Sequence, residues 1–137
     1  MQVMSLNDQI FKFIGGEHTA AVATITGDKP AVRLMALVGL EDLSLIGVTM
    51  KNSRKVDQIK KNPATELSIW AGDRSDPYIL LHCKAEVHED LDTKKKFWDP
   101  RMEQYLQKPD NPNYVVLKFV PEKIEYYHNM RMDIWEK

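Results

Sequence analysis

This sequence of 137 residues contains only one cysteine and no long apolar run. Its single cysteine, Cys83, cannot form a disulfide within the chain, which fits a reducing compartment. No apolar run approaches the roughly 18 residues that a membrane-spanning helix needs. Residues 1–14 lack the order of charged, apolar and small residues that marks a signal peptide. We therefore expect a cytoplasmic protein without a membrane partner.

An excess of charge of either sign is also absent. The chain has 19 Lys and Arg against 20 Asp and Glu, a formal net charge of −1. A nucleic-acid-binding surface usually carries a broad excess of basic residues, so the balance argues against a nucleic-acid partner. The charges are distributed unevenly along the chain, however. Residues 51–61 hold five basic and one acidic residue, a net +4, which leaves 14 basic against 19 acidic residues, or −5, elsewhere.

Strand-forming segments dominate the sequence. Alternating, β-branched or apolar runs predict strand segments in residues 19–25, 31–38, 43–49, 65–70, 78–88, 114–120 and 123–128, the last two on either side of Pro121. Together they indicate a domain of about six strands. Helical spacing predicts short helices over residues 5–14, 53–61 and 92–106, the last divided by Pro100. Most connections between strands are short, which favours antiparallel pairing in a meander or Greek-key barrel. The sequence therefore predicts one mainly β (α+β) domain over residues 1–137.

Two of the predicted strands are too apolar for a sheet with one wet face. In residues 31–38 both alternating sets are apolar except for Arg33, and residues 79–81 are apolar throughout. Strands of this kind need cover on both faces. A barrel interior covers one face, and a helix or a second subunit must cover the other. We therefore predict a homodimer.

Arg33 is the first candidate binding residue. It lies in the middle of an apolar strand, where a charge without a partner is costly. One interpretation is a rim arginine whose guanidinium reaches water along the barrel edge. The other is a cation that binds an anionic ligand.

The helix that begins near Ser53 is the second candidate. Arg54 and Lys55 lie in its first turn, and Lys51 precedes it. Cations at a helix N-terminus face the positive end of the helix dipole, which costs roughly 0.3–1 kcal/mol each. The arrangement is favourable if an anion binds there, because backbone N–H groups and basic side chains then converge on it. A solvated basic helix is the alternative.

A hairpin between residues 31–38 and 43–49 would join these two features. Pairing Val38 with Leu43 places Arg33 opposite Val48, and a shift of one residue places it opposite Thr49. Either register brings Arg33 close to Thr49 and to the basic helix start. The combined set would suit one phosphate monoester, since charged hydrogen bonds contribute roughly 1.5–3 kcal/mol each. Its members are Arg33, Thr49, Ser53 and Lys55, with Arg54 beside them.

These motifs resemble the FMN-binding stretch of the pyridoxamine 5′-phosphate oxidase-like split-barrel superfamily. They are Arg33-Leu34-Met35, Val48-Thr49, the run from Ser53 to Ile59, and Asn62-Pro63. Later motifs resemble its bacterial general stress protein branch: Phe97-Trp98-Asp99-Pro100, Asp110-Asn111-Pro112, Val116, Val120-Pro121-Glu122 and Glu125-Tyr126-Tyr127. The resemblance extends from about His18 to His128.

The resemblance implies a six-stranded antiparallel split β-barrel with short flanking helices, assembled as a homodimer. One FMN would bind in each of two clefts at the subunit interface, and FAD is a variant that the same phosphate contacts could hold. Arg33, Ser53, Arg54 and Lys55 would surround the phosphate, with Thr49 beside it. The strand backbone at Leu34, Met35 and Val48 would lie along the isoalloxazine ring.

Two departures from the oxidase concern the reaction. Tyr78 stands where the oxidase has a glutamine, and residues 129–137 lack the arginine and histidine pattern that holds its pyridoxal substrate. We therefore expect a flavin-dependent oxidoreductase, connected with stress, that acts on another small molecule and does not carry out the vitamin B6 reaction. The sequence identifies no catalytic residue and no electron donor. The alternatives are a protein of the same fold that binds flavin, deazaflavin or haem without turnover, and a nucleic-acid or protein-interaction module.

The histidines, the cysteine and the tryptophans suggest no further site. His82 and His88 share a strand face but lie about 20 Å apart at ~3.3 Å per residue, and Cys83 points the other way. We therefore expect no metal site. Trp70, Trp98 and Trp135 could stack on a flavin or a substrate, although packing in the core or an interface is the more common role.

Overall fold

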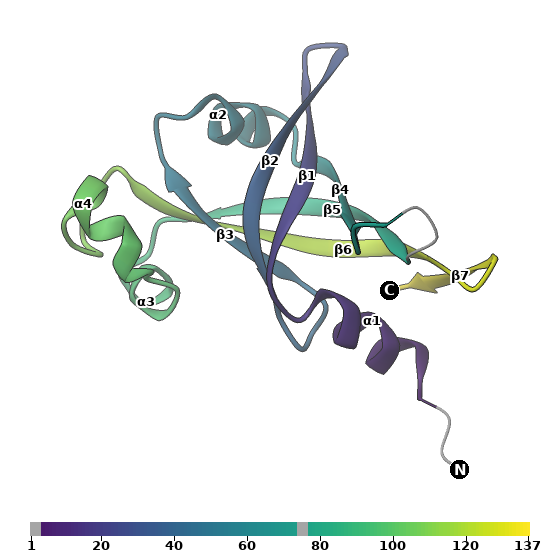
Figure 1. Cartoon of the computed structure of the whole chain (residues 1–137). Helices are drawn as coiled ribbons and strands as arrows, with labels where there is room; N and C mark the ends of the chain where they lie inside the picture. Colours follow the sequence, from purple (N-terminus) through teal and green to yellow (C-terminus); the bar gives the residue numbers. More distant parts are fainter. Residues whose placement is uncertain (1–3, 74–76) are drawn as a thin grey trace.

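Six antiparallel strands form a barrel in the computed structural model, which describes residues 4–73 and 77–137 (Figure 1). These strands are β1 (Gly16–Thr26), β2 (Lys29–Gly39), β3 (Leu45–Met50), β4 (Ala64–Trp70), β5 (Tyr78–His88) and β6 (Tyr114–His128). Their order in the sheet is β3-β2-β1-β4-β5-β6, and pairing of β3 with β6 closes the barrel. The predicted mainly β, six-stranded antiparallel barrel with short helices is confirmed.

Strand β6 makes closure of the barrel possible because two different strands pair with successive parts of the same edge. One edge pairs with β5 from end to end, whereas the other pairs first with β3 and then with β7 (Arg131–Glu136). The prediction of two strands around Pro121 is wrong, since one strand runs through it. Pro121 pairs with Cys83 and Lys123 with His82, so Glu122 has no partner in the register. Such a bulge accommodates a residue that lacks a backbone N–H.

The strand β7 is absent from the sequence-based prediction. It forms a hairpin with β6 through Asn129 and Met130, both of which have positive φ angles, 50° and 64°. Two-residue hairpin turns of this kind normally contain Asn-Gly or Asp-Gly. Methionine in the second position hides the turn from a reading of the sequence.

Short helices cover the barrel. Helix α1 (Leu6–Ile14) buries Ile10 and Ile14 completely in the barrel core. Its C-terminal end lies against β2 so closely that a Cβ on Gly39 would come within 2.0 Å of the Ile14 carbonyl oxygen. Helix α2 (Arg54–Lys61) packs Val56 and Ile59 into the same core.

A second helical segment, which we call the α3–α4 arm, lies beside the β3–β6 side of the barrel (Figure 1). It consists of α3 (Leu91–Lys96), the 3-10 turn η1 (Pro100–Met102) and α4 (Glu103–Leu106). Pro100 begins the second piece, as predicted. The arm packs on a small cluster of its own that includes Ile46, Leu106 and Tyr114. No helix in the described part of the chain has the length and apolar character needed to span a membrane.

A histidine between two carboxylates links three strands on the outside of the barrel. The ring nitrogens of His82 on β5 contact Glu66 on β4 at 2.6 Å and Glu125 on β6 at 2.5 Å. When the imidazole is protonated, both ring nitrogens donate to the ionised carboxylates, which only accept hydrogen bonds. The hydrogen bond to Glu125, with a smaller contribution from Glu66, raises the pKa of His82 above its usual 6.5 despite partial burial.

Replacing His82 with glutamine should remove a pH-dependent part of the stability. Protonated His82 stabilises the fold fully below pH 6.5, and this contribution disappears as the pH rises through the raised pKa of the folded state. The thermal midpoint of H82Q should therefore lie below that of the wild type at about pH 6 and approach it once the pH has risen past the raised pKa of folded His82. Glu125→Gln, followed in the same circular-dichroism series, should show the same trend. A difference that is constant with pH would contradict this role.

Candidate functional site

The N-terminus of α2 carries a serine with an unused hydroxyl group. Ser53 is the N-cap of this helix, and its backbone is extended as a cap requires. A capping serine normally accepts a hydrogen bond from a backbone N–H of the first turn. The Ser53 side chain accepts none, and its Oγ is buried without a hydrogen-bond partner in the described residues. Buried hydroxyls without partners are rare, so this atom is a candidate ligand contact.

Arg33 lies midway along β2, and neutral oxygen atoms of β1 and α2 hold its guanidinium. Nη1 donates to the Thr24 hydroxyl at 2.8 Å and to the Val22 backbone oxygen at 3.1 Å. Nη2 donates to Oε1 of Gln58 at 2.8 Å, and the Thr24 hydroxyl donates to the same oxygen at 2.6 Å. These hydrogen bonds orient the guanidinium without neutralising its charge.

Three cations share this region. Burial lowers the pKa of Arg33 and the nearby charge of Arg54 lowers it further, while Lys55 has its pKa lowered first by burial and then by Arg33. Lys55 Nζ donates to the buried Thr49 hydroxyl at 3.1 Å. Among the residues that the structure describes, no carboxylate forms an ion pair with any of the three. Like charges gathered without a protein counter-ion favour an anionic ligand.

The other basic residues of the same segment are already paired with acids. Lys51 and Lys60 contact Glu89 at 2.8 and 3.6 Å, and Lys61 contacts Asp57 at 3.2 Å. The positive charge that the sequence places in residues 51–61 is therefore concentrated at the start of α2, which weakens the interpretation of a solvated basic helix.

The predicted hairpin register is wrong, although the residues still meet. Strands β2 and β3 pair only at Val38–Ile46 and Gly39–Leu45. Arg33 pairs with Val22 on β1, and β3 turns away to pair Val48 and Thr49 with β6. Arg33 and Thr49 are brought together by Lys55 and α2 instead of by strand pairing. We call Arg33, Thr49, Ser53, Arg54 and Lys55 the cationic pocket.

The three residues predicted to lie along a ring occupy different environments. Leu34 is 72% exposed on the outer face of β2, whereas its neighbour Met35 points into the core. Val48 on β3 is half-buried and pairs with Val116. Leu34 and Val48 are therefore open to an outside molecule, while Met35 can contribute only backbone atoms there.

Comparison with known proteins identifies the family. Residues 6–128 match the family described as pyridoxamine 5′-phosphate oxidase, a range that includes the whole cationic pocket. The chain belongs to this family. It is 24% identical over 126 residues to general stress protein 26 of Bacillus subtilis (strain 168), covering 90% of this chain and 89% of that protein.

Solved structures of pyridoxamine 5′-phosphate oxidase relatives share the fold. General stress protein 26 from Bacillus anthracis str. Sterne superposes with a TM-score of 0.82 at 28% identity, covering 98% of this chain and all of that one. A protein related to general stress protein 26 from Clostridium acetobutylicum has a TM-score of 0.74 at 21% identity, covering 93% and 89%.

Structures with the same fold include proteins described by different cofactors. An FMN-binding protein from Nostoc punctiforme has a TM-score of 0.68 at 14% identity, covering 88% and 86% of the two chains. A heme-binding protein from Mycobacterium smegmatis has a TM-score of 0.76 at 14% identity, covering 99% of this chain and 60% of that one. An F420 reductase has a TM-score of 0.67 at 21% identity, covering 83% of this chain and 94% of that one. At these identities the likeness concerns the fold alone.

The cationic pocket of this family member fits a phosphate group. Phosphate offers acceptor oxygens and up to two negative charges, which match the Ser53 hydroxyl and the three cations around it. First-turn N–H groups of a helix have no partner within the helix, and α2 has no side-chain cap to satisfy them. An anion at this point would complete both sets of hydrogen bonds.

Two residues that position Arg33 were missed in the sequence, namely Thr24 and Gln58. Gln58 lies one helical turn after Arg54, on the same side of α2, and that spacing is the only signal that could have drawn attention to it. Thr24 carries no signal, because its role depends on the pairing of β1 with β2.

Replacing Ser53 with alanine should leave the stability of the ligand-free protein unchanged or increase it. An N-cap serine normally contributes about 0.5–2 kcal/mol, but the Ser53 hydroxyl makes no capping bond and its burial is unfavourable. Ser5→Ala is the matched control, because Ser5 accepts a hydrogen bond from Asp8 N at the start of α1. That variant should lose about 1 kcal/mol in urea unfolding. A loss of similar size in Ser53→Ala would show that the hydroxyl serves the helix and not a ligand.

Proposed function

We propose that the protein binds FMN with the phosphate in the cationic pocket. The observation that carries the proposal is the buried Ser53 hydroxyl beside three cations, with neither a hydrogen-bond partner nor a counter-ion in the described part of the chain. Family membership and the FMN-binding protein of the same fold from Nostoc punctiforme support it. FAD has a phosphate at the same place in the molecule, so the pocket would also suit FAD.

The residues of this chain would hold the cofactor in two ways. Arg33, Arg54 and Lys55 would neutralise the phosphate, Ser53 would donate a hydrogen bond to it, and Thr49 would lie beside it. The backbone at Leu34, Met35 and Val48 would lie along the isoalloxazine ring. A bound flavin supplies redox chemistry, which leaves binding, orientation and electrostatic tuning to the protein. This division suits an oxidoreductase acting on a small molecule, and the B6 reaction is not part of the proposal.

A homodimer with the cofactor at its interface forms the second part of the proposal. The outer face of β2 exposes an apolar row in which Val32, Leu34 and Val38 are 71%, 72% and 42% accessible. Half-buried Ala21 and Ala23 of β1 lie directly beside Leu34 and Val32. A contiguous apolar face of this kind marks an interaction surface. A second copy of the chain would cover it and would also enclose a ring placed along Leu34.

A related candidate function is binding without turnover. The heme-binding protein and the F420 reductase show that the fold accommodates other cofactors, so this chain could hold flavin, deazaflavin or haem as a carrier or sensor. The cationic pocket favours a cofactor with a phosphate group over haem. Reduction of the bound cofactor by a nicotinamide or deazaflavin donor distinguishes an enzyme from a carrier. A nucleic-acid or protein-interaction module is less well supported, because most basic residues of 51–61 are paired with acids.

Lys55→Gln should weaken FMN binding roughly 10- to 150-fold, which corresponds to one charged hydrogen bond of about 1.5–3 kcal/mol. Titration followed by flavin fluorescence measures this. Riboflavin lacks the phosphate, so its affinity should be the same for Lys55→Gln and the wild type. Lys61→Gln, at the far end of α2 and already paired with Asp57, is the matched control and should bind FMN normally. Equal FMN affinity in all three proteins would reject the phosphate assignment.

Leu34→Asp should dissociate the dimer into monomers at micromolar concentration, because it places a charge at the centre of the apolar face. Sedimentation velocity measures the change. Met130→Asp is the control, since Met130 is fully exposed at the β6–β7 turn, away from β2. The interface proposal fails if the wild type sediments as a monomer or if both variants remain dimeric. Loss of FMN affinity together with dissociation would support a cofactor site that both subunits share.

A further inference from the structure

A cavity of about 400 Å³ lies between the barrel and the α3–α4 arm. The outer faces of β2 and β3 form one wall through Ala36, Val38 and Val48, and Phe97 and Trp98 of the arm form the opposite wall. Trp98 packs edge-on against the buried Tyr114, with ring centres 5.1 Å apart, which restrains the indole. The cavity, which we call the slot, therefore has an aliphatic and an aromatic wall, a lining that suits an apolar ring.

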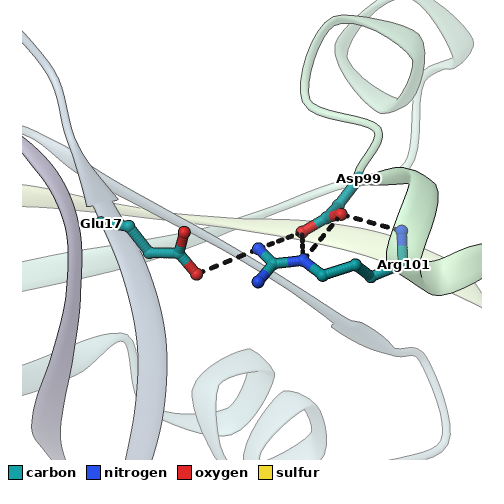
Figure 2. Close-up of polar contacts among 3 residues, drawn as sticks. All are labelled: Glu17, Asp99 and Arg101. Carbon is teal, nitrogen blue, oxygen red and sulfur yellow. Dashed lines mark hydrogen bonds and ion pairs between the residues drawn. The ribbon is translucent and has the colours of Figure 1, made fainter.

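The charged groups at this cavity are paired with one another (Figure 2). Arg101 directs Nε to both carboxylate oxygens of Asp99 at 3.1 and 2.9 Å, and Nη2 to Asp99 at 2.6 Å. The same Nη2 reaches Glu17 on β1 at 3.0 Å. Two carboxylates and one guanidinium leave a net charge of −1 and no unpaired cation among the described lining residues.

We propose that this cavity binds an uncharged, planar ring compound. Apolar walls and the absence of an available cation favour a neutral ligand over a carboxylate or phosphate, because an anion would meet the negative Glu17–Arg101–Asp99 group. Aromatic side chains favour stacking or edge contacts with a ring. The cavity is large enough for two fused rings.

The position of the cavity assigns this compound to the redox reaction, a step that rests on the proposed flavin site. Val48 is both a wall of the cavity and one of the residues expected along the isoalloxazine ring. Ala36 follows Leu34 on the same face of β2, since alternate residues of a strand share a face. A ligand in the slot would therefore adjoin a flavin ring placed along Leu34 and Val48, as the second reactant must.

Two fluorescent probes that differ in one sulfonate group test the charge preference. N-phenyl-1-naphthylamine is neutral, and 8-anilino-1-naphthalenesulfonate is its anionic counterpart. The wild type should bind the neutral probe at least 10-fold more tightly. The double variant Glu17→Gln/Asp99→Asn leaves Arg101 unpaired, so the ratio of affinities should shift at least 10-fold toward the sulfonate. Glu41→Gln/Glu103→Gln makes the same change in net charge at two exposed positions outside the cavity and should leave the ratio unchanged.

Two tryptophan variants locate the bound probe. Ala36→Trp fills the slot and should abolish binding of both probes, whereas Met130→Trp, at the exposed β6–β7 turn and outside the lining, should not. An affinity ratio that is equal in all proteins, or binding that survives Ala36→Trp, overturns the inference. FMN titration of the same variants keeps the two proposals separate. A probe response without FMN binding rejects the flavin site and the redox assignment but leaves the ring-binding cavity, whereas FMN binding without the probe response rejects only the cavity.

Discussion

A guanidinium that keeps its charge within a set of neutral oxygen atoms connects the separate parts of this molecule. Arg33 donates to the Val22 carbonyl and the Thr24 hydroxyl on β1 and to Gln58 on α2. One side chain on β2 thereby fixes the position of α2 relative to the barrel. Because none of these partners is an acid, the same hydrogen bonds that orient the arginine leave its charge for a ligand. Structural order and binding capacity come from one set of contacts.

Barrel closure determines where that charge is used. Strand β3 pairs with β2 through two residue pairs only, whereas its other edge pairs with β6 from Leu45 to Met50, up to the segment that leads into α2. Beyond these two pairs β3 turns away from β2, and Lys55 of α2 links the two strands, since it donates to Thr49 on β3 and lies near the charge of Arg33 on β2. The same outward turn of β3 makes one wall of the slot beneath the α3–α4 arm, so both candidate sites depend on one departure from regular pairing.

The sequence indicates residue types more reliably than it indicates geometry here. Arg33 within an apolar strand and the cations at Ser53–Lys55 are visible as local anomalies, and the apolar outer face of β2 is visible from its lack of alternation. The strand register cannot be predicted from the sequence, because Val38 and its neighbours are apolar on both faces and give no basis for choosing the paired residue. The β6–β7 turn was missed since Met130 replaces the usual glycine. The Arg33–Gln58 hydrogen bond joins residues 25 positions apart, and the Glu17–Arg101 contact joins residues 84 positions apart. No local sequence pattern encodes contacts over such separations.

The alternation of side chains along β2 makes this strand unusually intolerant of changes in length. Arg33 and Met35 face the barrel while Leu34 and Val32 face outward, so a single inserted or deleted residue would exchange the two sets. The guanidinium would then point outside and the apolar row would meet the core. A point substitution at one of these positions alters one face of β2, whereas an inserted or deleted residue disrupts both faces together. Divergence among relatives should therefore accumulate length changes in the loops around β2 and only substitutions within it.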